Sequence, residues 1–219
     1  MKEVLKLYQE IEEPYLKKIK LSIEKIRQDQ KFLGEGRAGR VYTCEEETFC
    51  IKEIINASPD FSFNEIEIEM EIQIEVKKYG IRVPMPMLLF QNSSGQKFLV
   101  MERIFGASIQ DIEEGKADFP TNFNAEEFFE EVKAMVAKMH KNNLYHRDLH
   151  SGNLMIEVKD DKIKPVIIDF GHSSHSYGED DPYKEKNFPR IGHTKIFPKD
   201  DLEIKRMKDR IILMLTKKQ

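Results

Sequence analysis

The sequence predicts an α+β fold in which a β-rich region comes first and a mainly helical region follows. Two β-rich runs, 40–44 and 48–54, flank a short acidic turn and follow a glycine-rich segment. Further along, apolar residues recur at helical spacing in 125–141, after a candidate N-cap at Asn124, and again in 200–215. The expected inward residues are Phe128, Val132, Met135, Val136 and Met139 in the first helix and Leu202, Met207, Ile211 and Leu215 in the second. With 219 residues, of which 40% are hydrophobic, the chain is long enough for one two-lobed domain or two small ones.

The glycine-rich segment contains Gly34, Gly36 and Gly39 and ends at Val41. Because glycine has no Cβ atom, a backbone of this composition can approach phosphate groups closely. A dinucleotide-binding loop with similar spacing would lead into a helix, whereas here a strand pattern follows, so we expect strand, loop, strand. A lone match of this kind is weak evidence, and the residues around it have to support it.

The second strand of the expected hairpin carries Lys52, which is a candidate ligand of the α- and β-phosphates of a nucleotide. An exposed lysine on a strand is the ordinary alternative. Val41 and Cys50 are apolar residues of a size that suits the roof of an adenine ring. Their ordinary alternative is strand core.

A polar segment supplies the candidate chemistry. It reads Tyr145-His-Arg-Asp-Leu-His-Ser-Gly-Asn153, and Asp169-Phe-Gly171 follows it. Phosphoryl transfer needs a carboxylate near the attacking hydroxyl and oxygen ligands for metal ions that neutralise the triphosphate. Asp148 is the candidate base, and Asn153 and Asp169 are the candidate Mg²⁺ ligands. The alternative is a polar turn whose side chains only cap helix ends and close turns.

The order of these motifs, a glycine loop, a strand lysine, an HRD loop with Asn five residues after Asp, and DFG, resembles the eukaryotic-like protein kinase superfamily over residues 32–171. The resemblance implies a bilobal fold, with an antiparallel-sheet N-lobe, a reduced helical C-lobe and ATP between them. It also implies an adenine-binding hinge in Phe98–Ile104. Met101 would be its gatekeeper, and Glu102 and Ile104 would offer backbone hydrogen bonds.

Members of this superfamily have a helix whose glutamate pairs with the strand lysine. Residues 65–76 alternate polar and apolar side chains strictly, as a strand would, but their number and their glutamate content favour a helix. Asn64 and Gly80 would cap this helix. The segment Gly80–Pro86 also resembles RIO kinases and the small kinase subunit of the KEOPS tRNA-modifying complex.

The expected helix offers several glutamates, so helical geometry has to choose among them. The inward stripe would contain Ile68, Ile72, Val76 and Tyr79. Glu69 lies beside this stripe and is our candidate partner for Lys52, and Glu71 is the alternative.

We expect a helical N-terminal extension in 1–30, an N-lobe in 31–104 and a C-lobe in 105–219. In the extension an apolar stripe starts at Leu5, is interrupted by Pro14 and resumes at Ile19. After Gly171 no A-P-E sequence follows, so we expect no activation segment and an activity that does not depend on phosphorylation.

Composition limits the other classes of function. The formal net charge of −4 and the pI near 5.9 argue against general nucleic-acid binding. No apolar run approaches the roughly 18 residues of a membrane-spanning helix, and the charged N-terminus lacks the apolar core of a signal peptide. The two cysteines fit a reducing compartment. We therefore expect a cytoplasmic monomer, or a protein delivered into a host cytosol.

Three functions are compatible with these residues. The first is a constitutively active serine/threonine kinase that uses ATP and Mg²⁺, phosphorylates itself and an unidentified protein, and resembles bacterial effector kinases. The second is a small-molecule kinase of the aminoglycoside or sugar type. The third is a KEOPS-like ATPase or partner subunit. His150 stands where protein kinases commonly have a lysine, which puts one phosphate contact in doubt.

Overall fold

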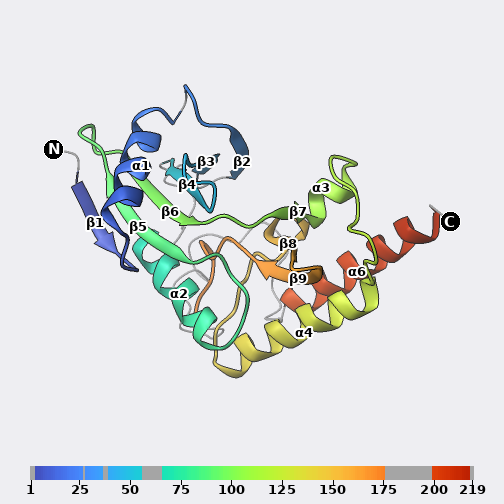
Figure 1. The fold of residues 1–219 in the computed structure, drawn as a ribbon. Helices are drawn as coiled ribbons and strands as arrows, with labels where there is room; N and C mark the ends of the chain where they lie inside the picture. Colours follow the sequence, from blue (N-terminus) through green and yellow to red (C-terminus); the bar gives the residue numbers. More distant parts are fainter. Residues whose placement is uncertain (1–2, 27, 37–38, 56–65, 176–198, 218–219) are drawn as a thin grey trace. The chain divides into compact units, whose positions relative to one another are not determined.

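The computed structural model describes residues 3–26, 28–36, 39–55, 66–175 and 199–217 (Figure 1). The chain divides into two compact units. Unit 1 consists of Met1–Phe63 and Pro84–Arg103, and unit 2 consists of Asn64–Val83 and Ile104–Gln219. The segment before Pro84 thus belongs to unit 2, although the residues on both sides of it belong to unit 1.

Unit 1 is built on one antiparallel sheet of six strands in the order β1-β5-β6-β4-β3-β2. The strands are β1 (Glu3–Leu7), β2 (Phe32–Gly36), β3 (Gly39–Thr43), β4 (Phe49–Ile54), β5 (Pro86–Gln91) and β6 (Lys97–Glu102). Strand β3 pairs with β2 on one side and with β4 on the other. This pairing confirms the expected strand, glycine loop, strand and the hairpin that follows.

Helix α1 (Glu13–Glu24) covers one face of this sheet. Its residues Ile19 and Ile23 share one buried cluster with apolar side chains of four strands: Tyr42, Ile51, Leu88, Phe90, Phe98 and Val100. Full burial of a side chain of this size contributes about 1.5–3 kcal/mol to stability. Helix α1 is therefore part of the core of unit 1.

The prediction of a helix from the start of the chain is wrong for its first part. Glu3–Leu7 forms the edge strand β1, which pairs with β5, and Leu5 and Leu7 are exposed. Pro14 stands in the first turn of α1, where its missing N–H costs no helical hydrogen bond. Pro14 therefore starts a helix here and does not interrupt one.

Unit 2 is mainly helical and contains a small second sheet. Its helices are α2 (Ile66–Lys78), α3 (Ile109–Glu113), α4 (Ala125–Lys141), the short 3₁₀ helix η1 (Ser151–Asn153) and α6 (Lys199–Lys217). Strands β7 (Gly106–Ser108), β8 (Leu154–Lys159) and β9 (Lys162–Ile167) form an antiparallel sheet in this order. Together the two units confirm the predicted α+β class.

Helix α2 confirms the choice of a helix over a strand, but its inward face differs from the expected stripe. Ile68 is 46% exposed, whereas Ile72 and Val76 are buried as expected. Glu69, at 4% exposure, occupies the inward position one residue further along. The helix ends before Gly80, whose φ of 75° is the left-handed conformation of a C-terminal cap. The expected N-cap, Asn64, lies outside the described residues.

Helix α4 has the predicted bounds, and the Asn124 side chain accepts from the backbone N–H groups of Glu126 and Glu127. The expected inward side chains of α4 are all buried: Phe128, Val132, Met135, Val136 and Met139. In α6 the expected inward residue Leu202 is 42% exposed, and Ile204 is buried instead. No helix in the described ranges is long and apolar enough to span a bilayer.

Candidate active site

The candidate catalytic segment lies between α4 and β8, in unit 2 (Figure 1). Two backbone hydrogen bonds join Tyr145 to Ser174, with N···O distances of 2.9 and 3.0 Å. These bonds tie the start of the HRD segment to the residues that follow DFG. Two segments that are separate in the sequence therefore form one polar site.

His146 is fully buried and connects the two segments. Its Nε2 lies 3.0 Å from the carbonyl oxygen of Ile168, and its ring centroid lies 5.0 Å from that of Phe170. The Ser173 hydroxyl donates to the His146 carbonyl oxygen over 3.3 Å. Since a carbonyl can only accept, Nε2 carries the proton in this arrangement. His146 is thus a structural link that also positions its neighbour Asp148.

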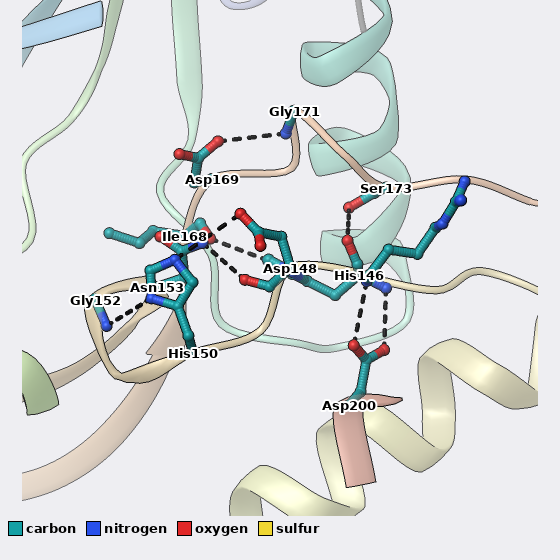
Figure 2. A network of polar contacts seen from close by, with 11 residues as sticks. His146, Asp148, His150, Gly152, Asn153, Ile168, Asp169, Gly171, Ser173 and Asp200 are labelled. Atoms are coloured by element: carbon teal, nitrogen blue, oxygen red, sulfur yellow. Dashed lines mark hydrogen bonds and ion pairs between the residues drawn. The ribbon is translucent and has the colours of Figure 1, made fainter. Parts of the chain in front are cut away.

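Asp200, at the start of α6, supports the same segment from below in Figure 2. Its carboxylate accepts from the backbone N–H groups of His146 and Arg147, over 3.2 and 3.1 Å. The same carboxylate lies 3.1 Å from Nε2 of His140 on α4. Burial raises the pKa of Asp200, but the His140 hydrogen bond and the charges of His140 and His146 outweigh burial and lower it overall. The Asp200 carboxylate therefore stays ionised and holds the two backbone N–H groups in place.

Asn153 is buried and holds the turn that follows Asp148 closed. Its side-chain amide donates to the Asp148 carbonyl oxygen over 2.9 Å, and its own carbonyl accepts from the N–H of Ile168 over 3.0 Å. No described residue donates a hydrogen bond to the Asn153 side-chain oxygen. This oxygen is the candidate ligand of a cation.

Asp169 and Arg147 both adopt left-handed backbone conformations, with φ of 63° and 68°. This region is uncommon for residues other than glycine and costs about 1 kcal/mol or more for a side chain such as arginine. One carboxylate oxygen of Asp169 accepts from the N–H of Gly171 over 3.3 Å. Strain of this kind persists where the surroundings impose it, and here the contacts of Asp200 and Gly171 do so.

The side chains of Asp148 and His150 are neighbours (Figure 2). Nδ1 of His150 accepts from the N–H of Gly152 over 3.0 Å. Its Nε2 lies 3.8 Å from the Asp148 carboxylate, which is too long for a hydrogen bond. Both side chains are well exposed, at 50% and 40%. The Asp148 carboxylate is therefore exposed, as a base that contacts an acceptor hydroxyl has to be.

In unit 1, strand register places four of the predicted nucleotide-binding residues on one face of the sheet. Val41 pairs with Lys52, and Cys50 pairs with Met101. Directly paired residues point to the same side, as do residues two apart along a strand, so Val41, Cys50, Lys52 and Met101 share one face. Tyr42, Ile51 and Val100 alternate with them and pack on the side of α1.

The glycine loop and the strand lysine lie next to each other in unit 1. Gly39 is opposite Ile54 on β4, and a Cβ atom on Gly39 would overlap the carbonyl oxygen of Glu53. Only glycine fits there without a shift of the backbone. Gly34 and Gly36 lie on β2. Lys52 is 7% exposed, so it is not the ordinary solvated lysine of the alternative interpretation.

The backbone of Glu102, in the expected hinge, is partly in use. Its N–H donates to the carbonyl oxygen of Met85 over 2.8 Å. Its carbonyl accepts from the thiol of Cys50, with an S···O distance of 3.7 Å. Burial raises the pKa of Cys50 to about 12, so this thiol keeps its proton. Both backbone groups of Glu102 thus have partners in unit 1, and its role in adenine binding stays a prediction. Ile104, the other expected hinge residue, belongs to unit 2.

Glu69 is the buried candidate for the partner of Lys52, and the alternative Glu71 is exposed. Glu69 belongs to unit 2 and Lys52 to unit 1, so their pairing stays a prediction. Sequence reasoning missed Asp200 and His140. An acidic residue in the first turn of a helix is usually a favourable charge near the helix dipole, so Asp200 gave no signal of a further role.

The comparison with protein families agrees with this geometry. Residues 27–188 match the protein kinase domain, and the chain belongs to this family. The match confirms the predicted kinase-like fold, and the family uses ATP and a divalent metal in general. The chain is therefore a kinase-like phosphotransferase by family.

Two curated relatives are similar to part of the chain. An EKC/KEOPS complex subunit of Schizosaccharomyces pombe is 32% identical over 106 residues, which is 48% of this chain and 43% of the relative. A probable bifunctional tRNA threonylcarbamoyladenosine biosynthesis protein of Methanosphaera stadtmanae is 31% identical over 100 residues, which is 46% of this chain and 16% of the relative. The chain spans less than half the length of either relative.

Proposed function

We propose that the protein is a serine/threonine protein kinase that transfers the γ-phosphate of ATP to a protein hydroxyl with the help of Mg²⁺. The observation that supports this best is that Asp148, Asn153 and Asp169 lie on two segments of unit 2 that hydrogen bonds hold together. Buried His146 and Asp200 brace the segment that carries Asp148, and Asn153 bonds to both segments. Such preorganisation suits a reaction whose rate comes mainly from positioning and charge stabilisation.

Asp148 is the residue that we expect to contact the acceptor. Its carboxylate is accessible, while its backbone carbonyl is held by the amide of Asn153. In the proposal it orients the acceptor hydroxyl and accepts its proton as the bond from that oxygen to the γ-phosphorus forms, while the bond from the γ-phosphorus to the β–γ bridging oxygen breaks and ADP leaves. The same activity would include autophosphorylation, and it would also suit a bacterial effector that acts on a host protein.

The ligand oxygens of Asn153 and Asp169 fit a magnesium ion. Both are hard oxygen donors, and Mg²⁺ is typically held by one or two protein groups with water and substrate phosphates completing its shell. No cluster of three His, Cys, Asp or Glu side chains suited to a metal occurs among the described residues, so no all-protein cage competes with this arrangement. A bound Mg²⁺ would neutralise charge on the phosphates.

The remaining roles rest on unit 1 and α2. Lys52 would bind the α- and β-phosphates, and Glu69 would hold Lys52 in place. Gly34, Gly36 and Gly39 would let the backbone approach the phosphates. Val41 and Cys50 would contact the adenine ring, with Met101, Glu102 and Ile104 beside it. The proposal requires residues of both units to act on one ATP molecule.

We also propose that activity does not require phosphorylation of the segment after Gly171. Ser173 is 1% exposed, and its hydroxyl donates to the carbonyl of His146, so it is not accessible to a kinase in this state. Of the other candidate sites, Ser174 is half-buried, and Ser176 and Tyr177 lie outside the described residues. Phosphatase-treated protein should retain full activity. Loss of activity that returns only on rephosphorylation would exclude this part of the proposal.

A second candidate is an ATPase or partner subunit of a complex, because one relative is named as an EKC/KEOPS complex subunit and the other as a tRNA threonylcarbamoyladenosine biosynthesis protein. Arg147 argues for the first candidate, since KEOPS-type kinases usually have a small residue there. Incubation with labelled ATP, alone and with a cell lysate, separates the two. Labelled protein supports the kinase, and release of free phosphate alone supports the ATPase. A labelled metabolite would instead identify a small-molecule kinase.

The assignment of residues is tested with Asp148→Asn and Asp169→Asn, with Asp209→Asn as the matched control. Asp209 is an exposed residue of α6 that carries the same charge. We expect the first two variants to lose transfer by at least about a thousandfold and the control to keep it. Equal phosphate incorporation by all of these proteins would exclude the proposed roles.

A further inference from the structure

A hollow of about 360 Å³ lies in unit 2, and none of its lining residues is one of the predicted catalytic or nucleotide-binding residues. Three elements contribute to it: the C-terminal end of α2 with the residues after it, the middle of α4, and β9. Its lining residues are Lys77, Gly80, Ile81, Arg82, Glu131, Ala134, Met135, Lys138 and Lys164. Small-molecule pockets typically have volumes of about 300–1,000 Å³.

The rim of the hollow carries an excess of positive charge. Lys77, Lys138 and Lys164 are exposed, and none of their ammonium groups forms an ion pair or hydrogen bond with a described residue. Glu131 is the single acidic residue of the lining. These lysines come from three different elements, so the charge cannot be the ordinary solvated face of one helix. An excess of positive charge here is notable in a chain of net charge −4.

The floor of the hollow differs from its rim. Ile81 and Met135 are buried at 2% and 6% exposure, and they belong to the apolar core of unit 2. Arg82 is held by the carboxylate of Glu157 through two bonds of 2.6 and 2.8 Å, so its charge is already balanced. An apolar floor under unpaired ammonium groups suits a ligand with an organic body and charged phosphate groups. Lysine binds phosphate as a mobile point charge.

We propose that this hollow is a binding site for a small organic molecule that carries two or more phosphate groups. The phosphates would lie against Lys77, Lys138 and Lys164, and the organic part would lie over Ile81 and Met135. The ligand would thereby connect α2, α4 and β9. Arg82 lines the hollow, and its carbonyl oxygen accepts from the N–H of Ile167, two residues before Asp169. A bound ligand would therefore lie close to the segment that leads to Asp169. The binding site itself does not depend on the proposed kinase activity.

The test uses inorganic tripolyphosphate as the probe and maps lysine reactivity by acetylation and mass spectrometry. Lys141, on the same helix as Lys138, and Lys162, on the same strand as Lys164, are matched controls outside the lining. We expect the probe to lower acetylation of the three lining lysines severalfold and to leave both controls unchanged. Equal protection of lining and control lysines, or no protection, would overturn the proposal.

Calorimetric titration supplies an independent readout. The double variant Lys138→Glu/Lys164→Glu should bind tripolyphosphate about a hundredfold more weakly at this site, which is about tenfold for each charge-assisted contact. The double variant Lys141→Glu/Lys162→Glu should bind as the parent protein does. Equal weakening in both would mean non-specific charge attraction. Protection of the lining by a single-stranded oligonucleotide but not by tripolyphosphate would point to a nucleic-acid surface and would also overturn the proposal.

Discussion

Replacement of Asp200 by Asn is the sharpest test of how the HRD segment is held. The carboxylate accepts from two backbone N–H groups and from the His140 ring. An asparagine has the same size but only one acceptor oxygen. If that oxygen bonds to the N–H of Arg147, the amide NH₂ group faces the N–H of His146, and two donors then oppose each other.

The expected loss follows from these contacts. One buried donor left without a partner costs about 1–3 kcal/mol, and the remaining bonds lose the strength that the charge gave them. We therefore expect the free energy of unfolding to fall by about 2–4 kcal/mol. With a urea m-value of about 2 kcal/mol per molar, the unfolding midpoint falls by about 1–2 M. Since the chain has no tryptophan, far-UV circular dichroism is the probe of choice.

Asp201→Asn is the matched control, because Asp201 is the next residue of α6 and is exposed. Its midpoint should stay within about 0.3 M of that of the parent protein, as for most surface substitutions. The lowered pKa of Asp200 also sets a pH dependence. A depressed carboxyl pKa stabilises the fold above the ordinary value of 3.8, and this stabilisation is lost as the pH falls through the folded value. Equal midpoints for both variants at pH 7 would refute the reasoning.

Three further predictions follow from buried contacts. Burial raises the pKa of both thiols, that of Cys50 to about 12. Ellman's reagent at pH 8 should therefore react with no thiol of the folded protein and with two thiols in urea. A fast-reacting thiol in the folded protein would contradict this. Gly106→Ala should lower the melting temperature by several degrees, because its Cβ atom would overlap the carbonyl oxygen of Ile156; an unchanged melting temperature would count against it. Glu157→Gln should lower the free energy of unfolding by about 2–4 kcal/mol in urea titrations, because buried Glu157 holds Arg82 through two bonds. An unchanged free energy of unfolding would mean that the pair does not stabilise the fold.

Elements with local signals were predictable from the sequence. Helix α4 was predicted with both ends, because the Asn124 cap and the periodic apolar residues lie within the helix and its flank. Helix α2 was harder, since its alternating pattern resembles a strand, and residue composition decided correctly. Its inward face contains Ile72 and Val76 as expected, but Glu69 is buried and Ile68 is exposed. A strictly alternating pattern does not mark one helical face, so it could not tell Glu69 from Ile68.

Strand β1 could not be predicted for a different reason. Its hydrogen bonds go to β5, more than 75 residues further along the chain. Leu5 and Leu7 are exposed, whereas Val4 packs against the core cluster of unit 1, so Leu5 does not mark the buried face of this segment. The same apolar spacing that suggested a helix in 5–11 therefore carried no information about packing. The segment forms a strand because it pairs with the edge of β5, and that edge exists only once the sheet has folded.

The candidate site was predictable where a motif carries the chemistry. Asp148, Asn153 and Asp169 were identified from their spacing, and alternation along β4 already implied that Cys50 and Lys52 share a face. Asp200 was not identified, because its role depends on where α6 begins relative to the HRD segment. Long-range supports of this kind leave no local pattern. The partner of Lys52 stays a prediction.

The edge position of β1 has a practical consequence for how the protein is produced. A polypeptide trimmed to the family match at residue 27 would lose both β1 and α1. The backbone of β5 would then become an open edge, and the face that Ile19 and Ile23 cover would be exposed. Open apolar edges promote aggregation. Soluble expression should therefore require the first 26 residues, and an affinity tag is better placed at the C-terminus, after α6, than directly before an edge strand.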